Sequence, residues 1–131
     1  MRALLAVVAT GALIITLSAP TVVKADHHVE TITGQVVDAM CFMKDKENNT
    51  GVDHKMPADV KDCAKICASN GVPMALVASD GNVYTITGDL AADNNAKVVP
   101  HIGHTVEITG AVSEEDGKMT ISAADIKHVS A

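Results

Sequence analysis

The stretch that decides the fold of this chain is Thr31-Ile32-Thr33-Gly34-Gln35-Val36-Val37-Asp38. Its β-branched residues and their alternation with other residues predict a β-strand. A glycine inside a strand is typical of a place where the strand bends. Gly88 and Gly110 occur at two further predicted strands. Strands that bend at glycines indicate a small closed or nearly closed barrel.

Four more strands are predicted, in two hairpins. The first hairpin joins residues 73–78 to 83–87 through Ser79-Asp80-Gly81-Asn82, because Asp-Gly tolerates the positive φ angles of a tight turn. The second joins residues 105–112 to 118–122, and we expect residues 126–129 to extend its last strand. The predicted fold is therefore mainly β, a five-stranded OB-like antiparallel barrel.

One helix is predicted after the first strand, over residues 58–70. Its signals are a preceding proline, a following glycine and apolar residues at helical spacing, namely Val60, Cys63, Ala64 and Cys67. An OB barrel usually carries its helix between strands three and four, so this helix is an insertion after strand one. Residues 44–57 are charged and lack an apolar period, which predicts an exposed loop.

Residues 1–25 have the composition of a cleavable export signal. Met1-Arg2 precede an apolar run from Ala3 to Leu17, and Val23-Lys24-Ala25 supply small residues for cleavage before Asp26. The apolar run is too short for a retained membrane span. We expect residues 26–131 to form a single OB-like domain that is periplasmic or secreted, and no membrane protein after cleavage.

The charge of this expected mature chain excludes two classes of partner. The whole chain has 10 Lys and Arg against 16 Asp and Glu, and cleavage removes Arg2 and Lys24, which leaves a net charge of −8. Such a chain repels nucleic-acid phosphates and anionic lipid head groups, and its only aromatic side chains are Phe42 and Tyr84. We expect its partner to be a metal ion or a periplasmic protein.

Several motifs resemble a known family. They are Gly34-Gln-Val-Val-Asp38-x-x-Cys41, then Cys63-Ala64-x-x-Cys67-x-x-x-Gly71-x-Pro73, then the Asp-Gly hairpin and the late Val-x-Ile-Thr-Gly strand. Together they resemble an uncharacterised group of small exported bacterial proteins with an OB-like fold. The group is associated with a histidine three residues before the first helical cysteine. Here that position is Val60, and the nearest histidine is His54.

Three cysteines, Cys41, Cys63 and Cys67, are an odd number for an exported chain. Exported proteins usually pair their cysteines, and three cannot all pair within one chain. One interpretation is a structural disulfide from Cys41 to Cys63 or Cys67, which would contribute about 3 kcal/mol by closing a loop. The remaining thiol would be buried, or would join two copies as a disulfide-linked dimer.

The other interpretation is a thiolate metal site. Cys63 and Cys67 are four residues apart and project from one helix face. With Cys41 they would supply three soft ligands, which favour copper(I) and then zinc. A fourth ligand would come from the adjacent loop or strand end: His54, Asp38 or a methionine such as Met43.

Two other histidine motifs fall outside the cysteine pattern. Cleavage before Asp26 would create Asp26-His27-His28, whose amine, amides and third-residue imidazole suit copper(II) or nickel(II). His101 and His104 are three residues apart in a polar connection. Two polar residues on an exposed loop are the simpler interpretation of that pair, and His128 stands alone near the C-terminus.

No catalytic or cofactor motif accompanies these residues. The cysteine spacing is not Cys-x-x-Cys, and Cys-x-x-Cys-His, Gly-x-Ser-x-Gly, His-Glu-x-x-His and phosphate-binding glycine loops are missing from the sequence. We therefore expect no enzyme activity, no haem and no nucleotide. The leading hypothesis is an exported copper or zinc binding or carrier protein, and the alternative is an interaction module with a structural disulfide.

Overall fold

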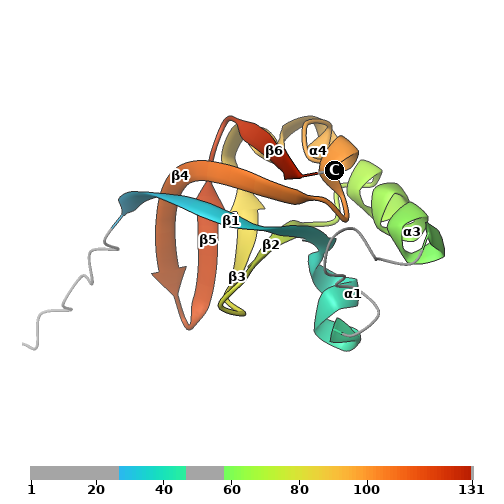
Figure 1. Cartoon of the computed structure of the whole chain (residues 1–131), viewed down its shortest axis with the longest axis horizontal. Coiled ribbons are helices and arrows are strands. Elements are labelled where there is room, and N and C mark those ends of the chain that lie inside the picture. Colours follow the sequence, from blue (N-terminus) through green and yellow to red (C-terminus); the bar gives the residue numbers. More distant parts are fainter. Residues whose placement is uncertain (1–26, 47–57, 131) are drawn as a thin grey trace, which may run out of the picture.

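The barrel is a single sheet that closes on itself. The computed structural model describes residues 27–46 and 58–130. Its strands are β1 (His28–Asp38), β2 (Met74–Ala78), β3 (Val83–Thr87), β4 (Thr105–Glu115), β5 (Lys118–Ser122) and β6 (Ile126–Ser130). They pair in the order β1-β2-β3-β5-β4-β6, and a further pairing of β1 with β4 closes a ring of five strands. The mainly β, OB-like barrel is therefore confirmed (Figure 1).

One strand pair differs from the predicted antiparallel arrangement. β3 and β5 run parallel, with Tyr84 opposite Met119 and Ile86 opposite Ile121, whereas the other strand pairings are antiparallel. The hairpin signals in the sequence are local and predict only neighbouring antiparallel pairs. The chain crosses from β3 to β4 through residues 88–104 before it forms the second hairpin, so β5 returns alongside β3 in the same direction.

The last strand also differs from the prediction. Residues 126–130 do not prolong β5 but form β6, which pairs with the first half of β4, with Val106 opposite His128. β5 pairs with the second half of that same long strand. A two-residue turn at Asp116 and Gly117 separates β4 from β5, so β4 extends to Glu115, beyond its predicted end.

Two glycines allow the strands to cross closely. Gly34 pairs both with Ala78 of β2 and with Val106 of β4, at the point where β1 passes from one neighbour to the other. A Cβ atom on Gly34 would lie 2.4 Å from the carbonyl oxygen of Val77, and one on Gly110 would lie 2.4 Å from that of Ser122. Neither position accepts a side chain without movement of the backbone.

Aliphatic side chains from the strands and connections fill the barrel. The fully buried members include Val36, Met74, Leu76, Leu90, Val98, Ile102, Val106, Ile108 and Ile121. Ala64 and Ala68 of the long helix pack into the same core. A smaller cluster of Val37, Phe42 and Ala75 lies on the other side of β1 and β2. The barrel therefore anchors both helices that carry cysteines.

Two helices follow β1. α3 (Ala58–Ser69) confirms the predicted cysteine-bearing helix, whereas α1 (Ala39–Lys44) is not predicted by the sequence pattern. The sequence predicts an exposed loop for residues 44–57, of which 47–57 lie outside the described residues. Both helices lie near the end of β1 (Figure 1).

An unusual turn holds the C-terminal end of α3. After η2 (Gly88–Leu90), the segment α4 (Ala92–Asn95) contains Asp93, Asn94 and Asn95 with φ angles of 50°, 56° and 58°. Asn95 is buried, and its Nδ2 donates hydrogen bonds to the carbonyl oxygens of Ala68 at 2.9 Å and Val72 at 3.1 Å. These bonds satisfy carbonyl groups at and beyond the last turn of α3 and fix the helix relative to the barrel.

Candidate functional site

Asp38 marks the end of β1 and the start of α1. Its backbone is extended, and its Oδ1 accepts hydrogen bonds from the amide nitrogens of Met40 at 2.8 Å and Cys41 at 3.0 Å. This is the arrangement of an N-cap, in which a short acidic side chain satisfies amides that lack a partner in the helix. The residue is only 1% exposed. The cap therefore places a buried carboxylate in the same turn as Cys41.

α3 supplies the other two thiols. Ala64 and Ala68 face the core, whereas Cys67 is partly buried and Cys63 is exposed. Because the two cysteines are four residues apart, their sulfurs lie on neighbouring turns of one face. This face is therefore more open to solvent at Cys63 than at Cys67.

Electrostatic interactions link Asp38 with the three cysteines. A hydrogen bond from the Cys67 thiol to Asp38, together with burial and the charges of Asp38 and Cys63, raises the pKa of Cys67 to about 11. Burial, the charge of Asp38, a hydrogen bond to Asp38 and the charge of Cys63 raise the pKa of Cys41, and Lys44 opposes that shift. We call Asp38, Cys41, Cys63 and Cys67 the thiol cluster.

The second carboxylate oxygen of Asp38 has a distinct environment. Oδ2 is buried, and the part of the chain that the structure describes contains no well-formed hydrogen bond to it. A buried carboxylate oxygen without a full partner is costly and favours an approaching proton donor or cation. The thiols of Cys41 and Cys67 are the groups whose pKa values this carboxylate affects most directly.

The thiol cluster is not arranged as a finished metal site. Among residues 27–46 and 58–130, no three His, Cys, Asp or Glu side chains already form a group that could hold a metal ion. Nor does a disulfide join the three cysteines, all of which the structure describes. The relation between the thiols is electrostatic: Asp38 and Cys63 each affect the pKa of both Cys41 and Cys67.

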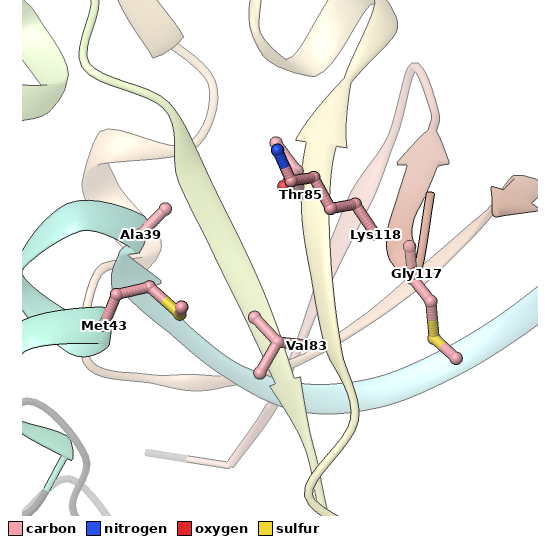
Figure 2. Close-up of a pocket in the computed structure, with 7 residues that line it drawn as sticks. Ala39, Met43, Val83, Thr85, Gly117 and Lys118 are labelled. Carbon is pink, nitrogen blue, oxygen red and sulfur yellow. The ribbon is translucent and has the colours of Figure 1, made fainter. Parts of the chain in front are cut away.

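Met43, the predicted methionine ligand, lies on a different surface. It is 70% exposed and lines a pocket of about 270 Å³ between α1, β3 and the turn from β4 to β5. The pocket is largely apolar, and Figure 2 shows the Met43 side chain beside Ala39 and Val83, with Lys118 across from them.

The remaining predicted residues separate into two sets. His54 and Asp26 lie outside the described residues. His27 is exposed, and the Nε2 of His28 lies 2.5 Å from Oε1 of Glu30, with which it forms an ion pair when it is protonated. The proposed copper(II) motif at the amino terminus therefore stays a prediction.

Sequence reasoning missed a cluster of histidines. His128 does not stand alone, because its ring centroid lies 5.0 Å from that of His104 and 6.1 Å from that of His101. The signal available in the sequence is Gly103 between the first two histidines, which favours a tight turn that brings them together. The pairing of β6 with β4, which adds His128, has no comparable local signal.

Comparisons with known proteins leave the function to be argued from these groups. No protein-family model, curated protein or solved structure matches the chain. Within residues 27–46 and 58–130, no helix combines the length and apolar character needed to cross a membrane.

Proposed function

We propose that this protein is an exported, non-catalytic binding or carrier protein for a soft metal ion, copper(I) before zinc, and that the thiol cluster is its site. One observation supports the proposal above the others. Burial and the carboxylate of Asp38 raise the pKa of Cys41, and the same carboxylate together with burial raises the pKa of Cys67 on a different helix; Cys63 adds to both shifts.

A bound cation would offset the electrostatic repulsion between the cysteine thiolates and the carboxylate of Asp38. Ionising a thiol beside a buried carboxylate places two negative charges close together, so the thiols keep their protons at neutral pH. A bound cation reverses this balance, because it attracts both the thiolates and the carboxylate. Metal binding would therefore release protons and strengthen as the pH rises.

The ligand types determine which ion fits. Three thiolates favour copper(I), and zinc follows because it accepts thiolates together with oxygen or nitrogen ligands. We assign Cys63 and Cys67 as a pair of ligands from one helix and Cys41 as the third. Asp38 would balance the charge and would serve as an oxygen ligand for zinc. His54 stays a candidate from a part of the chain that the structure does not describe.

The raised thiol pKa values also bear on catalysis. A nucleophilic cysteine needs a lowered pKa, and a pKa of about 11 at Cys67 leaves about one thiol in a thousand ionised at pH 8. This supports a binding role over a thiol-based enzyme. We infer export to the periplasm or beyond from the composition of residues 1–25, which is typical of a cleavable export signal.

The alternative function is an interaction module stapled by a disulfide. It is supported by the charge effect of Cys63 on the thiol of Cys41, which relates a cysteine of α3 to the cysteine of α1. A bond between Cys41 and Cys63 or Cys67 would tie α1 to α3 and leave one thiol.

Thiol counting and metal analysis separate the two functions. The exported protein would be isolated under argon, and its thiols would be titrated under denaturing, non-reducing conditions beside elemental analysis. Three thiols, with one equivalent of copper(I) bound in competition with a chelator, are expected for the metal carrier. One thiol and no copper(I) binding would support the staple, and no thiols together with a dimer on a non-reducing gel would support cross-linking.

Variants then assign the ligands. Cys41→Ser, Cys63→Ser and Cys67→Ser should each weaken copper(I) binding at least tenfold. Ser69→Ala is the matched control, because Ser69 is an exposed residue of the same helix. Binding that survives all three cysteine substitutions unchanged would contradict the assignment.

A further inference from the structure

Three imidazoles lie together on the barrel, although one of them comes from a distant part of the sequence. His101 ends η3 (Val99–His101), His104 precedes β4, and His128 lies in β6. The ring of His128 is tilted by 55° to that of His104 and by 40° to that of His101, with centroids 5.0 Å and 6.1 Å away. One ring from the end of the chain thus contacts both rings of the connection.

A defined turn presents the first two rings. The amide of His104 donates a hydrogen bond of 2.9 Å to the carbonyl oxygen of His101. Ile102 has φ −60° and ψ 127°, and Gly103 has φ +79°. These are the angles of a type II turn, which brings its first and fourth residues together and favours glycine at its third position. Ile102 is fully buried, so the turn is anchored in the core.

The barrel holds this turn in place from β1. The amide of Gly103 donates to the carbonyl oxygen of Val36 at 2.8 Å, and the amide of Val36 donates to that of His104 at 3.2 Å. The buried side chain of Gln35 donates through Nε2 to the carbonyl oxygen of Gly103 at 3.0 Å. Groups held by packed elements make more precise ligands than groups on unsupported loops.

The ring of His101 also presents a nitrogen that suits a metal ion. Its Nδ1 is buried without a hydrogen-bond partner among the described residues. A neutral imidazole nitrogen that lacks a donor is a suitable ligand for zinc, copper or nickel.

We propose that His101, His104 and His128 form a metal site of their own, for zinc or a similar divalent ion, separate from the thiol cluster. Zn–N bonds of about 2.0–2.1 Å in a tetrahedral site separate the imidazole centroids by about 5 Å. The observed separations of 5.0 Å and 6.1 Å are close to that value. Because the described nitrogens do not yet surround a common point, binding requires rotation of the rings, and the exposed His128 has room to rotate.

Lys61 would compete with the metal ion for the ring of His104. Its Nζ lies 3.2 Å from Nε2 of His104, so it interacts with one of the two ring nitrogens of that residue. A divalent cation at the three rings would be repelled by the ammonium group, which must move away when the ion binds. Replacing Lys61 with an uncharged residue should therefore strengthen binding, an effect that general damage to the fold would not produce.

The test uses the protein with Cys41, Cys63 and Cys67 all changed to serine, so that failure of the thiol cluster does not affect the result. Zinc would be titrated calorimetrically, and histidine ring signals would be followed by NMR. One equivalent of zinc is expected to shift the signals of all three rings. His128→Ala should weaken binding at least tenfold, Lys61→Gln should tighten it severalfold, and Ser69→Ala, a control at an exposed position outside both sites, should change nothing.

Two results would overturn the site. One is the failure of the cysteine-free protein to bind zinc while its circular dichroism stays that of the parent. The other is zinc binding that is as strong in His101→Ala and His128→Ala as in the Ser69→Ala control, with no gain in Lys61→Gln.

Discussion

The carboxylate of Asp38, at the end of β1, accepts a hydrogen bond from the thiol of Cys67 on α3 and raises the pKa of that thiol to about 11. The same carboxylate caps α1 through the amides of Met40 and Cys41. One buried group therefore connects a strand and two helices.

Replacing this carboxylate tests the connection. Asp38→Asn keeps an Oδ1 that can accept the capping hydrogen bonds but removes the negative charge, so the pKa of Cys67 should fall from about 11 toward its ordinary value of 9.0. Alkylation of Cys67, followed by mass spectrometry across pH, should become faster at pH 8. Asp62→Asn, an exposed acid on the same helix, is the control. An unchanged Cys67 profile in Asp38→Asn would contradict the assigned cause.

Stability should fall in alkali for the same reason. In the unfolded chain the Cys67 thiol loses its proton near its ordinary pKa of 9.0, whereas in the folded chain it keeps the proton up to about pH 11. The unfolded chain therefore binds fewer protons between these values, and the free energy of unfolding decreases as the pH rises through them. Urea unfolding at pH 8 to 11 should show a smaller decrease for Cys67→Ser. Equal slopes for both proteins would rule out this contribution.

The turn at Asn95 should control the stability of the α3 end. Asn95→Ala removes the donors to the carbonyl oxygens of Ala68 and Val72, and we expect a loss of about 1–3 kcal/mol in the free energy of unfolding. Asn70→Ala, which removes a similar bond at an exposed position, should cost less than about 0.5 kcal/mol. Urea unfolding measures both. Similar losses for the two variants would show that burial of Asn95 is not what matters.

The bend of β1 gives a fourth prediction. Gly34→Ala would force a Cβ to within 2.4 Å of the carbonyl oxygen of Val77, and the required backbone shift should cost roughly 1–3 kcal/mol. Gly117→Asn is the control, because its turn is open and asparagine tolerates the positive φ of 73°. A thermal melt of Gly34→Ala that matches the parent would show that the strands separate easily at this point.

The sequence predicts the parts of the fold that have local signals. The Asp80-Gly81 turn, the bend at Gly34 and the cysteine-bearing helix all depend on neighbouring residues, and the structure has each of them. The parallel pairing of β3 with β5 and the separate strand β6 depend on contacts between distant segments. Periodicity and turn composition contain no information on such contacts.

In the candidate sites, too, the sequence predicts the features that have a local signal and misses those that depend on long-range contacts. The helical period alone places Cys63 and Cys67 on one face of α3, because they are four residues apart. The role of Asp38 needs its cap geometry and the packing of α3 near it, which spacing does not reveal. His128 joins His101 and His104 only because β6 pairs with β4, a long-range contact.

The N-cap of α1 has a consequence for the pocket beside Met43. Ala39 and Met43 belong to the short helix that Asp38 caps, and both line that cavity. Any event at the sulfurs that pulls Oδ1 from the two amides would weaken the helix and alter the cavity wall. By thermodynamic reciprocity, a molecule lodged in the cavity would then change the affinity of the sulfurs for their ion by the same factor.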